Sequence, residues 1–367
     1  MSLENKSLTA IALQKFKQNF WGVFSFGYIV LMLFLALFAY VLAPDNSQNA
    51  NQMHLSIHSK SPGFSVTMLS IPSEFENANN FSDYFLGHTN QVTEVPIHSY
   101  SVTDNVLKYL EYNDDETLKI EKEIALDKFP GFQYMEEVAK QLIHQKTFYL
   151  GTDKYGRDLL SRMLVGSRVS ISIGFVAVLI SVVVGLFFGA LGGYYGGKVD
   201  AAVMWLVNVI WSIPTLLLVI AITLALGKGF WQVFVAVGLT MWVEVARVVR
   251  GQIISVKEMQ YVTAAKALGF SNVRIIINHI LPNIMAPVIV ISAANFASAI
   301  LVESGLSFLG LGAQPPIPSW GSMIKDHYSY IILGKPYLAL IPGIAIMFIT
   351  LAFMMTGNAL RDAMDVK

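Results

Sequence analysis

The chain has 367 residues, of which 54% are hydrophobic and 14% charged, and its formal net charge is zero. This composition indicates several membrane-spanning segments rather than one large soluble core. The balanced charge argues against a nucleic-acid-binding protein. Cysteine is absent, which excludes disulfides and thiolate metal sites and leaves the redox compartment open.

Apolar segments predict an all-α polytopic membrane protein with six spanning helices. The first, 20–43, is longer than the core of a signal peptide, so an uncleaved anchor is favoured over a cleaved signal. The others are expected at 169–191, 201–226, 230–249, 280–301 and 336–360. Lysines precede the first span, and a basic loop at 247–274 follows the fourth, so both termini are expected in the cytoplasm.

Residues 45–149 differ in character from the rest and predict an extracytoplasmic α+β insert. They are rich in Asn and Pro. The pattern at 63–71 is compatible with a strand, and that at 119–146 has helical spacing with mixed charges. A disordered loop of this length is the alternative. His54 and His58 have helical metal-ligand spacing but no third ligand, so no metal site is expected. The expected domains are therefore 1–44, 45–149 and 150–367.

A polar string at 150–158 precedes the second span. It is followed by an apolar stripe that predicts an amphipathic helix at the outer interface. Asp153 or Asp158 is expected to cap this helix rather than to act in catalysis. The residues singled out in this string are Gly151, Thr152, Asp153, Gly156, Arg157 and Asp158.

A row of glycines runs along the second span at every fourth position. Gly185, Gly189 and Gly193 would leave one helix face nearly bare, which favours close packing of a second helix. A sequence resembling a phosphate-binding loop begins at Gly192, but Val199 stands where Ser or Thr would hold magnesium. We therefore expect no ATP site, no bound cofactor and no catalytic residue in this chain.

Polar residues inside the spans indicate either a translocation pathway or helix contacts. Asn208, Trp211 and Asn295 are candidates for lining the pathway, with helix–helix hydrogen bonding as the equally plausible reading. Glu244 is expected to pair with Arg247 or with a partner subunit. Pro214, together with Trp211, is expected to kink the third span.

The stretch 260–282 predicts a docking element between the fourth and fifth spans. One face of a short helix would carry Tyr261, Ala264, Ala265 and Leu268. Gly269 would end this helix, Ser271 would cap the next one, and Pro282 would mark the entry of the fifth span.

This stretch resembles the EAA loop of ABC-importer permeases. Ala264, Ala265, Gly269, Leu281 and Pro282 match that pattern, whereas Thr263 and His279 depart from it. The start of the stretch, the His-Ile-Leu-Pro-Asn string at its end and the polar string at 150–158 are similar to those of C-type permeases of the dipeptide, oligopeptide and nickel importers. The resemblance covers 150–367 and the first span.

The resemblance implies partners as well as a fold. It implies a type I permease fold in a bacterial inner membrane, a homologous B-type permease, one or two ATPase subunits that bind ATP and magnesium, and an external substrate-binding protein. Tyr261, Ala264, Ala265, Leu268, Gly269 and Pro282 would then couple the ATPases to the spans. A peptide is the substrate favoured by this resemblance, with nickel or another small solute as the alternative. A secondary transporter remains the less favoured alternative class of protein. The insert is expected to contact the binding protein or the external face of the partner permease.

Overall fold

The computed structural model describes residues 8–72, 82–88, 92–114, 120–227 and 229–364. The chain divides into two compact units. The helical unit comprises Met1–Leu33, Ser170–Gln314 and Gly343–Lys367, and the sheet unit comprises Phe34–Val169 and Pro315–Pro342. Each unit is described below by itself.

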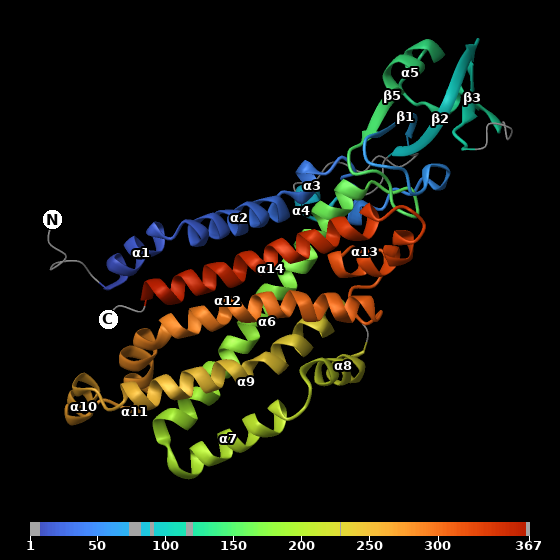
Figure 1. Ribbon diagram of the computed structural model, residues 1–367. Helices are drawn as coiled ribbons and strands as arrows, with labels where there is room; N and C mark the ends of the chain where they lie inside the picture. Colours follow the sequence, from blue (N-terminus) through green and yellow to red (C-terminus); the bar gives the residue numbers. More distant parts are fainter. Residues whose placement is uncertain (1–7, 73–81, 89–91, 115–119, 228, 365–367) are drawn as a thin grey trace. The chain divides into compact units, whose positions relative to one another are not determined.

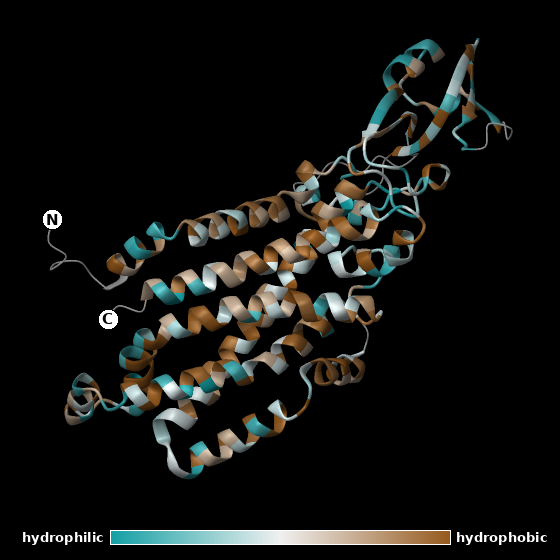
Figure 2. Ribbon diagram, viewed as in Figure 1, coloured by the Kyte–Doolittle hydropathy of each residue, from teal (hydrophilic) through white to brown (hydrophobic). Residues whose placement is uncertain are grey.

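Five helical segments in the described part of the chain are long and apolar enough to cross a membrane. Figure 2 shows that these long helices carry most of the hydrophobic residues. They are Phe20–Leu37 (α2), Leu159–Tyr195 (α6), Trp231–Val256 in α9 (Phe230–Val256), Asn272–Phe308 (α11, η5 and α12) and Tyr337–Met364 (α14). The chain is therefore a mostly helical polytopic membrane protein.

The expected third span is broken into two helices. α7 (Gly197–Trp211) and α8 (Thr215–Leu226) meet at a bend of 91°, which is visible in Figure 1. Pro214 lacks a backbone donor and disfavours helical geometry in the residue before it, which accounts for the break. The pair is one broken span or a re-entrant loop, so the described part of the chain holds five spans or six.

The glycine row of α6 lies against α9. A Cβ built on Gly185 would come within 2.5 Å of the Val245 side chain, and one on Gly189 within 2.7 Å of the Ala246 carbonyl oxygen. A Cβ on Gly193 would likewise meet Ile253 at 2.9 Å. The bare face thus lets two long helices approach backbone to backbone.

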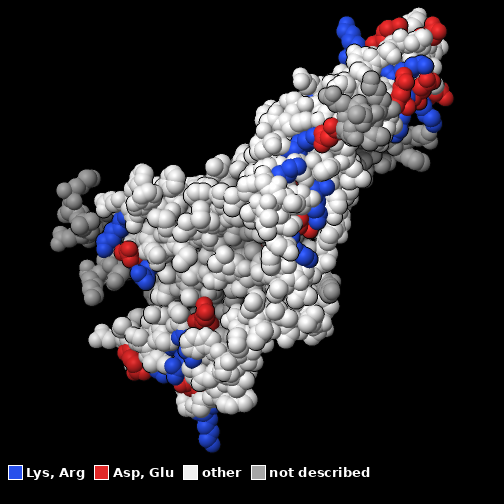
Figure 3. Space-filling model, turned by 45° about the vertical axis from the view of Figure 1, so that its right-hand side comes forward, with Lys and Arg blue, Asp and Glu red and all other residues white. Residues whose placement is uncertain are grey.

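A five-stranded antiparallel sheet forms the core of the insert, in the order β4-β3-β2-β1-β5. α5 (Met135–Leu142) covers one face, where Met135 and Val138 pack with Leu69, Ile97 and Leu107. The strands are β1 (Phe64–Pro72), β2 (Val92–Thr103), β3 (Val106–Glu111), β4 (Glu121–Ala125) and β5 (Ile143–Phe148). In the view of Figure 3, charged side chains gather on this part of the chain.

The α+β expectation for the insert is confirmed, with one local error. The strand expected at 63–71 is β1, but the helical pattern at 119–146 is wrong for most of its length. Only Met135–Leu142 is α-helical, and β4 and β5 occupy its two ends. The reason is tertiary: β4 and β5 pair with β3 and β1, and such pairing overrides a weak helical pattern.

Short helices complete the two units. They are α1 (Leu8–Gln18), α3 (Ala39–Leu42), α4 (Asp83–Leu86) and α13 (Trp320–His327). α13 lies in the sheet unit, where the Trp320 indole nitrogen donates to the Met163 carbonyl at 3.1 Å. A capping box in which Ser319 and Ser322 exchange hydrogen bonds starts this helix. The Gly- and Pro-rich segment 310–335 is thus partly ordered into a helix.

Candidate functional site

A short surface helix, α10 (Gln260–Ala267), is the candidate coupling site. Val262 and Ala265 are buried in a core cluster shared with α6, α9 and α12. Tyr261, Ala264 and Leu268 are exposed, Leu268 to 72%. Contrary to the sequence expectation, Ala265 does not share the open face. It lies one helical turn from Val262 and fastens α10 to the core, so the apolar residues divide between two sides.

Gly269 closes α10 in the left-handed conformation. Its φ is +77°, the Phe270 amide donates to the Ala265 carbonyl at 3.2 Å, and the Gly269 amide donates to Lys266 at 3.0 Å. These two bonds are those of a Schellman motif, which satisfies the last carbonyls of a helix. Glycine is required here by conformation, since no atom lies within 4 Å of an added Cβ.

The turn after α10 is fixed by Phe270 and its neighbours. The His279 ring stacks on Phe270 with centroids 5.7 Å apart, and the Arg274 guanidinium lies 4.2 Å from the same ring. Ser271 accepts the Arg274 amide and caps α11 (Asn272–Ile275). The Tyr194 hydroxyl at the end of α6 donates to Asn272 at 2.8 Å. The exposed face is therefore held at a fixed place on the spanning helices.

α11, which follows α10 after the turn at Gly269, passes into α12 (Leu281–Phe308) without a gap. α11 is followed by a π-helical turn, η5 (Ile276–Ile280), and Pro282 lies in the first turn of α12. The Asn283 side-chain amide donates to the His279 carbonyl at 2.7 Å. A π turn and a proline change the direction of a helix while keeping most of its hydrogen bonds. Pro282 thus stands where α10 and α11 join the long helix.

Basic side chains in α9 and directly after it are bonded to α7 and α6. Arg250 makes a two-bond ion pair with Asp200, and Lys257 donates to the Gly193 carbonyl at 3.2 Å. Arg247 donates to Asn208 at 2.7 Å, and its guanidinium lies over the Trp211 ring. Asn208 and Trp211, both expected as pathway residues, therefore hold Arg247. The expected Glu244–Arg247 pair is wrong, because Arg247 is turned toward α7.

Asn295 and Glu303 lie inside the helical unit. Both are at most 1% exposed, so neither lines an open passage in this conformation. The Ser307 hydroxyl donates to Glu303 at 2.6 Å. The alternative reading for Asn295, helix–helix hydrogen bonding, is not observed either, since its buried side-chain amide nitrogen has no hydrogen-bond partner among the described residues.

The polar string 150–158 forms a buried turn in the sheet unit. Asp153 accepts the amides of Tyr155 and Arg157 and the Arg157 guanidinium nitrogen Nε at 2.6 Å. Arg157 also donates to Asn51 at 3.0 Å. Asp158 caps α6 by accepting the Ser161 amide at 2.8 Å, and burial raises the pKa of its carboxyl. The separate interfacial helix expected here is absent from the described residues, because α6 runs unbroken from Leu159.

Two glycines let this turn pack against residues 54–61. A Cβ added at Gly151 would lie 2.2 Å from the Lys60 carbonyl oxygen, and one added at Gly156 would lie 1.8 Å from the His54 carbonyl oxygen. Both glycines have positive φ. Between them, the Thr152 hydroxyl donates to Ile57 and accepts the Lys60 amide. The partners of the turn in 45–61 were missed from sequence, because no local pattern reveals pairing across about 100 residues.

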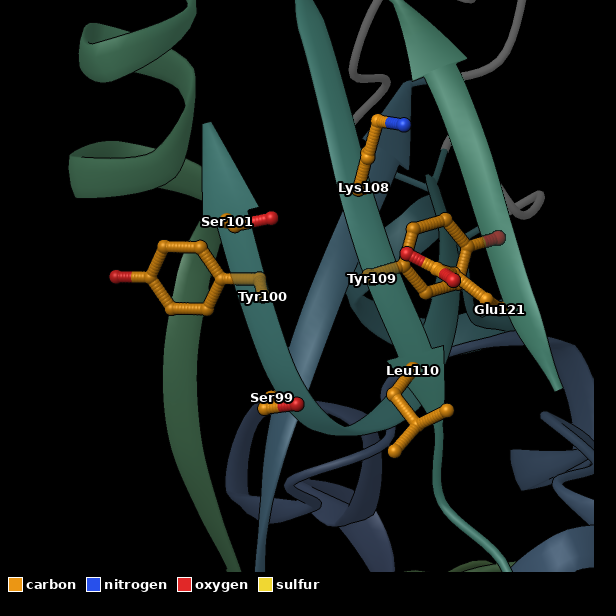
Figure 4. A pocket seen from close by; sticks show the side chains of 7 residues that line it. All are labelled: Ser99, Tyr100, Ser101, Lys108, Tyr109, Leu110 and Glu121. Carbon is orange, nitrogen blue, oxygen red and sulfur yellow. The ribbon is translucent and has the colours of Figure 1, made fainter. Parts of the chain in front are cut away.

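The described residues contain no cluster of metal-ligating side chains. His54 is buried, and its imidazole Nε2 lies 3.9 Å from the Glu94 carboxylate. His58 is exposed. A shallow hollow of about 280 Å³ lies on the open sheet face, where Figure 4 shows Ser99, Tyr100, Ser101, Lys108, Tyr109, Leu110 and Glu121. Lys108 pairs with Glu123 at 2.7 Å, as expected of a solvated sheet surface.

These features define a class of protein: a polytopic membrane protein whose spanning helices carry a rigidly seated surface helix. A sequence profile described as binding-protein-dependent transport system inner membrane component matches residues 173–366. A second profile, the N-terminal transmembrane domain of oligopeptide transport permease C, matches residues 7–62. The chain belongs to the family of binding-protein-dependent transport permeases.

Two transport permeases are similar to this chain over most of their own length. The dipeptide transport system permease protein DppC of Alkalihalophilus pseudofirmus is 41% identical over 219 residues, 60% of this chain and 72% of that protein. The glutathione transport system permease protein GsiD of Pectobacterium atrosepticum is 38% identical over the same shares. A solved inward-facing MetNI methionine ABC transporter matches 56% of this chain and 96% of its own with 16% identity and a TM-score of 0.46.

Proposed function

We propose that this chain is one permease subunit of an ATP-driven importer of peptides. It forms a translocation pathway with a second, homologous permease and takes its substrate from an external binding protein. Separate ATPase subunits hold ATP and magnesium. Membership of the permease family and the peptide-transport designations of its relatives support this assignment.

The observation that carries the proposal is the divided surface of α10. Val262 and Ala265 fasten the helix to the core, while Tyr261, Ala264 and Leu268 are exposed. Exposed apolar side chains grouped on one small surface are typical of a protein-binding site. We infer that the ATPase binds this face.

The positions of basic residues support the orientation. Arg247, Arg250, Lys257, Lys266 and Arg274 lie in or beside the loop after α9, with Glu258 as the one acidic residue between 247 and 274. Loops rich in Lys and Arg remain in the cytoplasm. The ATPase face, both termini and the coupling loop are accordingly cytoplasmic, and the sheet of the insert is external.

Alternating access is the mechanism that follows. Closure of the ATPases moves α10, and the continuous path through α11 and η5 carries that movement to α12. The two permease states must bind the ATPases and the binding protein with different affinities, since otherwise ATP binding could shift nothing.

The test is the rate of peptide uptake by reconstituted complexes. The tagged chain is co-expressed with its neighbouring permease, ATPase and binding-protein genes and placed in proteoliposomes. Uptake of labelled di- and oligopeptides that depends on ATP and on the binding protein supports the proposal. Uptake of a nickel chelate or another solute in place of peptides would assign a different substrate to the same machinery.

A further inference from the structure

Glu244 is a carboxylate on the surface of a spanning helix. It lies near the middle of α9 (Phe230–Val256) and is exposed. No hydrogen bond or ion pair joins it to any residue that the structure describes. An ionised side chain facing lipid is costly, so such a residue faces water, a ligand or a partner.

The nearest basic side chain on the same helix is unavailable. Arg247, three residues further on, lies over Trp211 and donates to Asn208. Arg250 is paired with Asp200. Neither cation of α9 therefore neutralises Glu244, and a positive group from outside this chain fits the position.

A groove in the helical unit begins one helical turn from Glu244. Val248, at i+4 and so on the same helix face, lines a cavity of about 620 Å³ together with residues of α12 and α14. Apolar walls are supplied by Pro287, Val290, Ile291 and Ala294, and Asn358 and Arg361 are its polar lining. The Arg361 guanidinium is largely exposed and lies 3.8 Å from the carboxylate of Asp362, its neighbour in sequence. The volume lies within the range of small-ligand sites.

The groove and its flank thus combine a carboxylate, an apolar middle and a guanidinium. A short peptide has a cationic amino group, variable side chains and an anionic carboxylate, so its two charges complement Glu244 and Arg361. Apolar walls accept side chains of different shape, as an importer of varied peptides requires.

We propose that Glu244 lines the translocation pathway and binds the cationic amino group of the passing peptide, with Arg361 toward its carboxylate end. This inference rests on the proposed function. A basic residue of the second permease, bound to Glu244 at the interface between the two permeases, is the competing occupant.

Because the chain contains no cysteine, single-cysteine labelling tests the site directly. Glu244→Cys and Val245→Cys are made in the complete transporter. Val245 is fully buried and serves as the adjacent control. A membrane-impermeant, positively charged methanethiosulfonate is applied, and mass spectrometry of this chain reads the modification. We expect Glu244→Cys to react at least tenfold faster than Val245→Cys, and imported dipeptide to slow that reaction several-fold.

A transport assay accompanies the labelling. We expect Glu244→Gln to lower the rate of dipeptide uptake about tenfold and Glu244→Asp to restore most of it. Glu136→Gln, which changes an exposed carboxylate on α5, is the control.

Absence of labelling, of protection by peptide or of the uptake defect overturns the proposal. Loss of the second permease from purified Glu244→Gln complexes assigns the residue to the interface instead. If wild-type complexes import no peptide, the proposed function itself fails; normal wild-type uptake with an unreactive Glu244→Cys rejects this inference alone.

Discussion

At the scale of single residues, positions in α10 and directly after it differ strongly in burial. Leu268 is 72% exposed, whereas Val262 is fully buried. Loss of an exposed side chain leaves the folded chain almost unchanged, but loss of a buried one leaves a cavity. If the ATPase binds this face, as proposed, its binding and the stability of the permease can be separated by substitutions six residues apart.

Leu268→Ala is expected to reduce the amount of ATPase that co-purifies without changing the melting temperature of the permease. Val262→Ala should lower stability by roughly 1–3 kcal/mol. Ile332→Ala, which truncates a 90% exposed side chain of the sheet unit, should change neither quantity. Equal ATPase recovery from Leu268→Ala and the wild type would show that the exposed face of α10 is not the contact.

Substitutions of Gly269 test the backbone geometry of the turn after α10 rather than the exposed face of the helix. A β-branched side chain at φ +77° costs roughly 1–2 kcal/mol or more. Gly269→Val should therefore insert normally but hydrolyse ATP without matching uptake. Gly269→Asn, which tolerates left-handed backbone, should retain coupling. Measuring both rates in proteoliposomes decides the matter, and normal uptake by Gly269→Val would refute the predicted role of the turn.

At the scale of elements, the turn 150–158 is fixed by close packing. Gly156 and Gly131 both have positive φ. A Cβ added at Gly156 would lie 1.8 Å from a carbonyl oxygen, whereas one added at Gly131 would meet no atom within 4 Å. Gly156→Ala should destabilise the sheet unit by about 2 kcal/mol or more. Gly131→Ala carries the backbone strain without the clash and should cost less. Thermal unfolding followed by proteolysis of the insert measures the difference, and equal losses would contradict this account.

Two buried histidines make the sheet unit sensitive to acid. Burial lowers the pKa of both His54 and His327 below the usual value of 6.5, although Glu94 and Asp45 near His54, and Asp153 and Asp326 near His327, oppose the shift. The unfolded chain therefore binds more protons as the pH falls through 6.5. The two neutral histidines therefore contribute fully to the free energy of unfolding above pH 6.5. That contribution is lost as the pH falls toward the lower pKa that they have in the folded chain.

The measurement is the melting temperature at pH 7.5 and pH 5.5. We expect acid to lower the wild-type value by about 3 °C or more, and the His54→Gln/His327→Gln variant to lose less. His98→Gln, an exposed site, should behave as wild type. A double variant with the full wild-type loss would exclude these two residues as the cause.

At the scale of the whole molecule, the sheet of the insert is separable from the segment that leads to it. The two matched family ranges, 7–62 and 173–366, leave out the sheet. The Gly63 amide donates to the Phe148 carbonyl at 3.0 Å, so the ends of the sheet segment are adjacent. Residues 45–61, by contrast, supply the partners of the turn 150–158.

Replacing 64–147 by a two-glycine link should leave a permease that inserts and retains its ATPase. Deleting 45–149 entirely should prevent accumulation of the protein. If the sheet contacts the binding protein, as proposed from its place in the chain, the shorter deletion should also weaken docking of that protein. Normal docking, measured by surface plasmon resonance on nanodiscs, would remove the sheet from the interface.

Features that depend on neighbours in the sequence were predicted better than features that depend on pairing between distant segments. Hydrophobic runs placed five spans, and turn chemistry placed Gly269, Ser271 and Pro282, because these depend on neighbours in sequence. The inward side of Ala265 and the pairing of Arg247 with Trp211 were not predictable, since each depends on a helix brought close only by folding. The strands β4 and β5 were missed for the same reason.

Mild-detergent purification of the tagged chain from its native membrane shows whether the exposed face of α10 binds an ATPase. Mass spectrometry of what co-purifies should find a second permease and one or two ATPase subunits, with the ATPases lost from Leu268→Ala. A chain that purifies as a self-sufficient oligomer without any ATPase, even after crosslinking, would contradict the account.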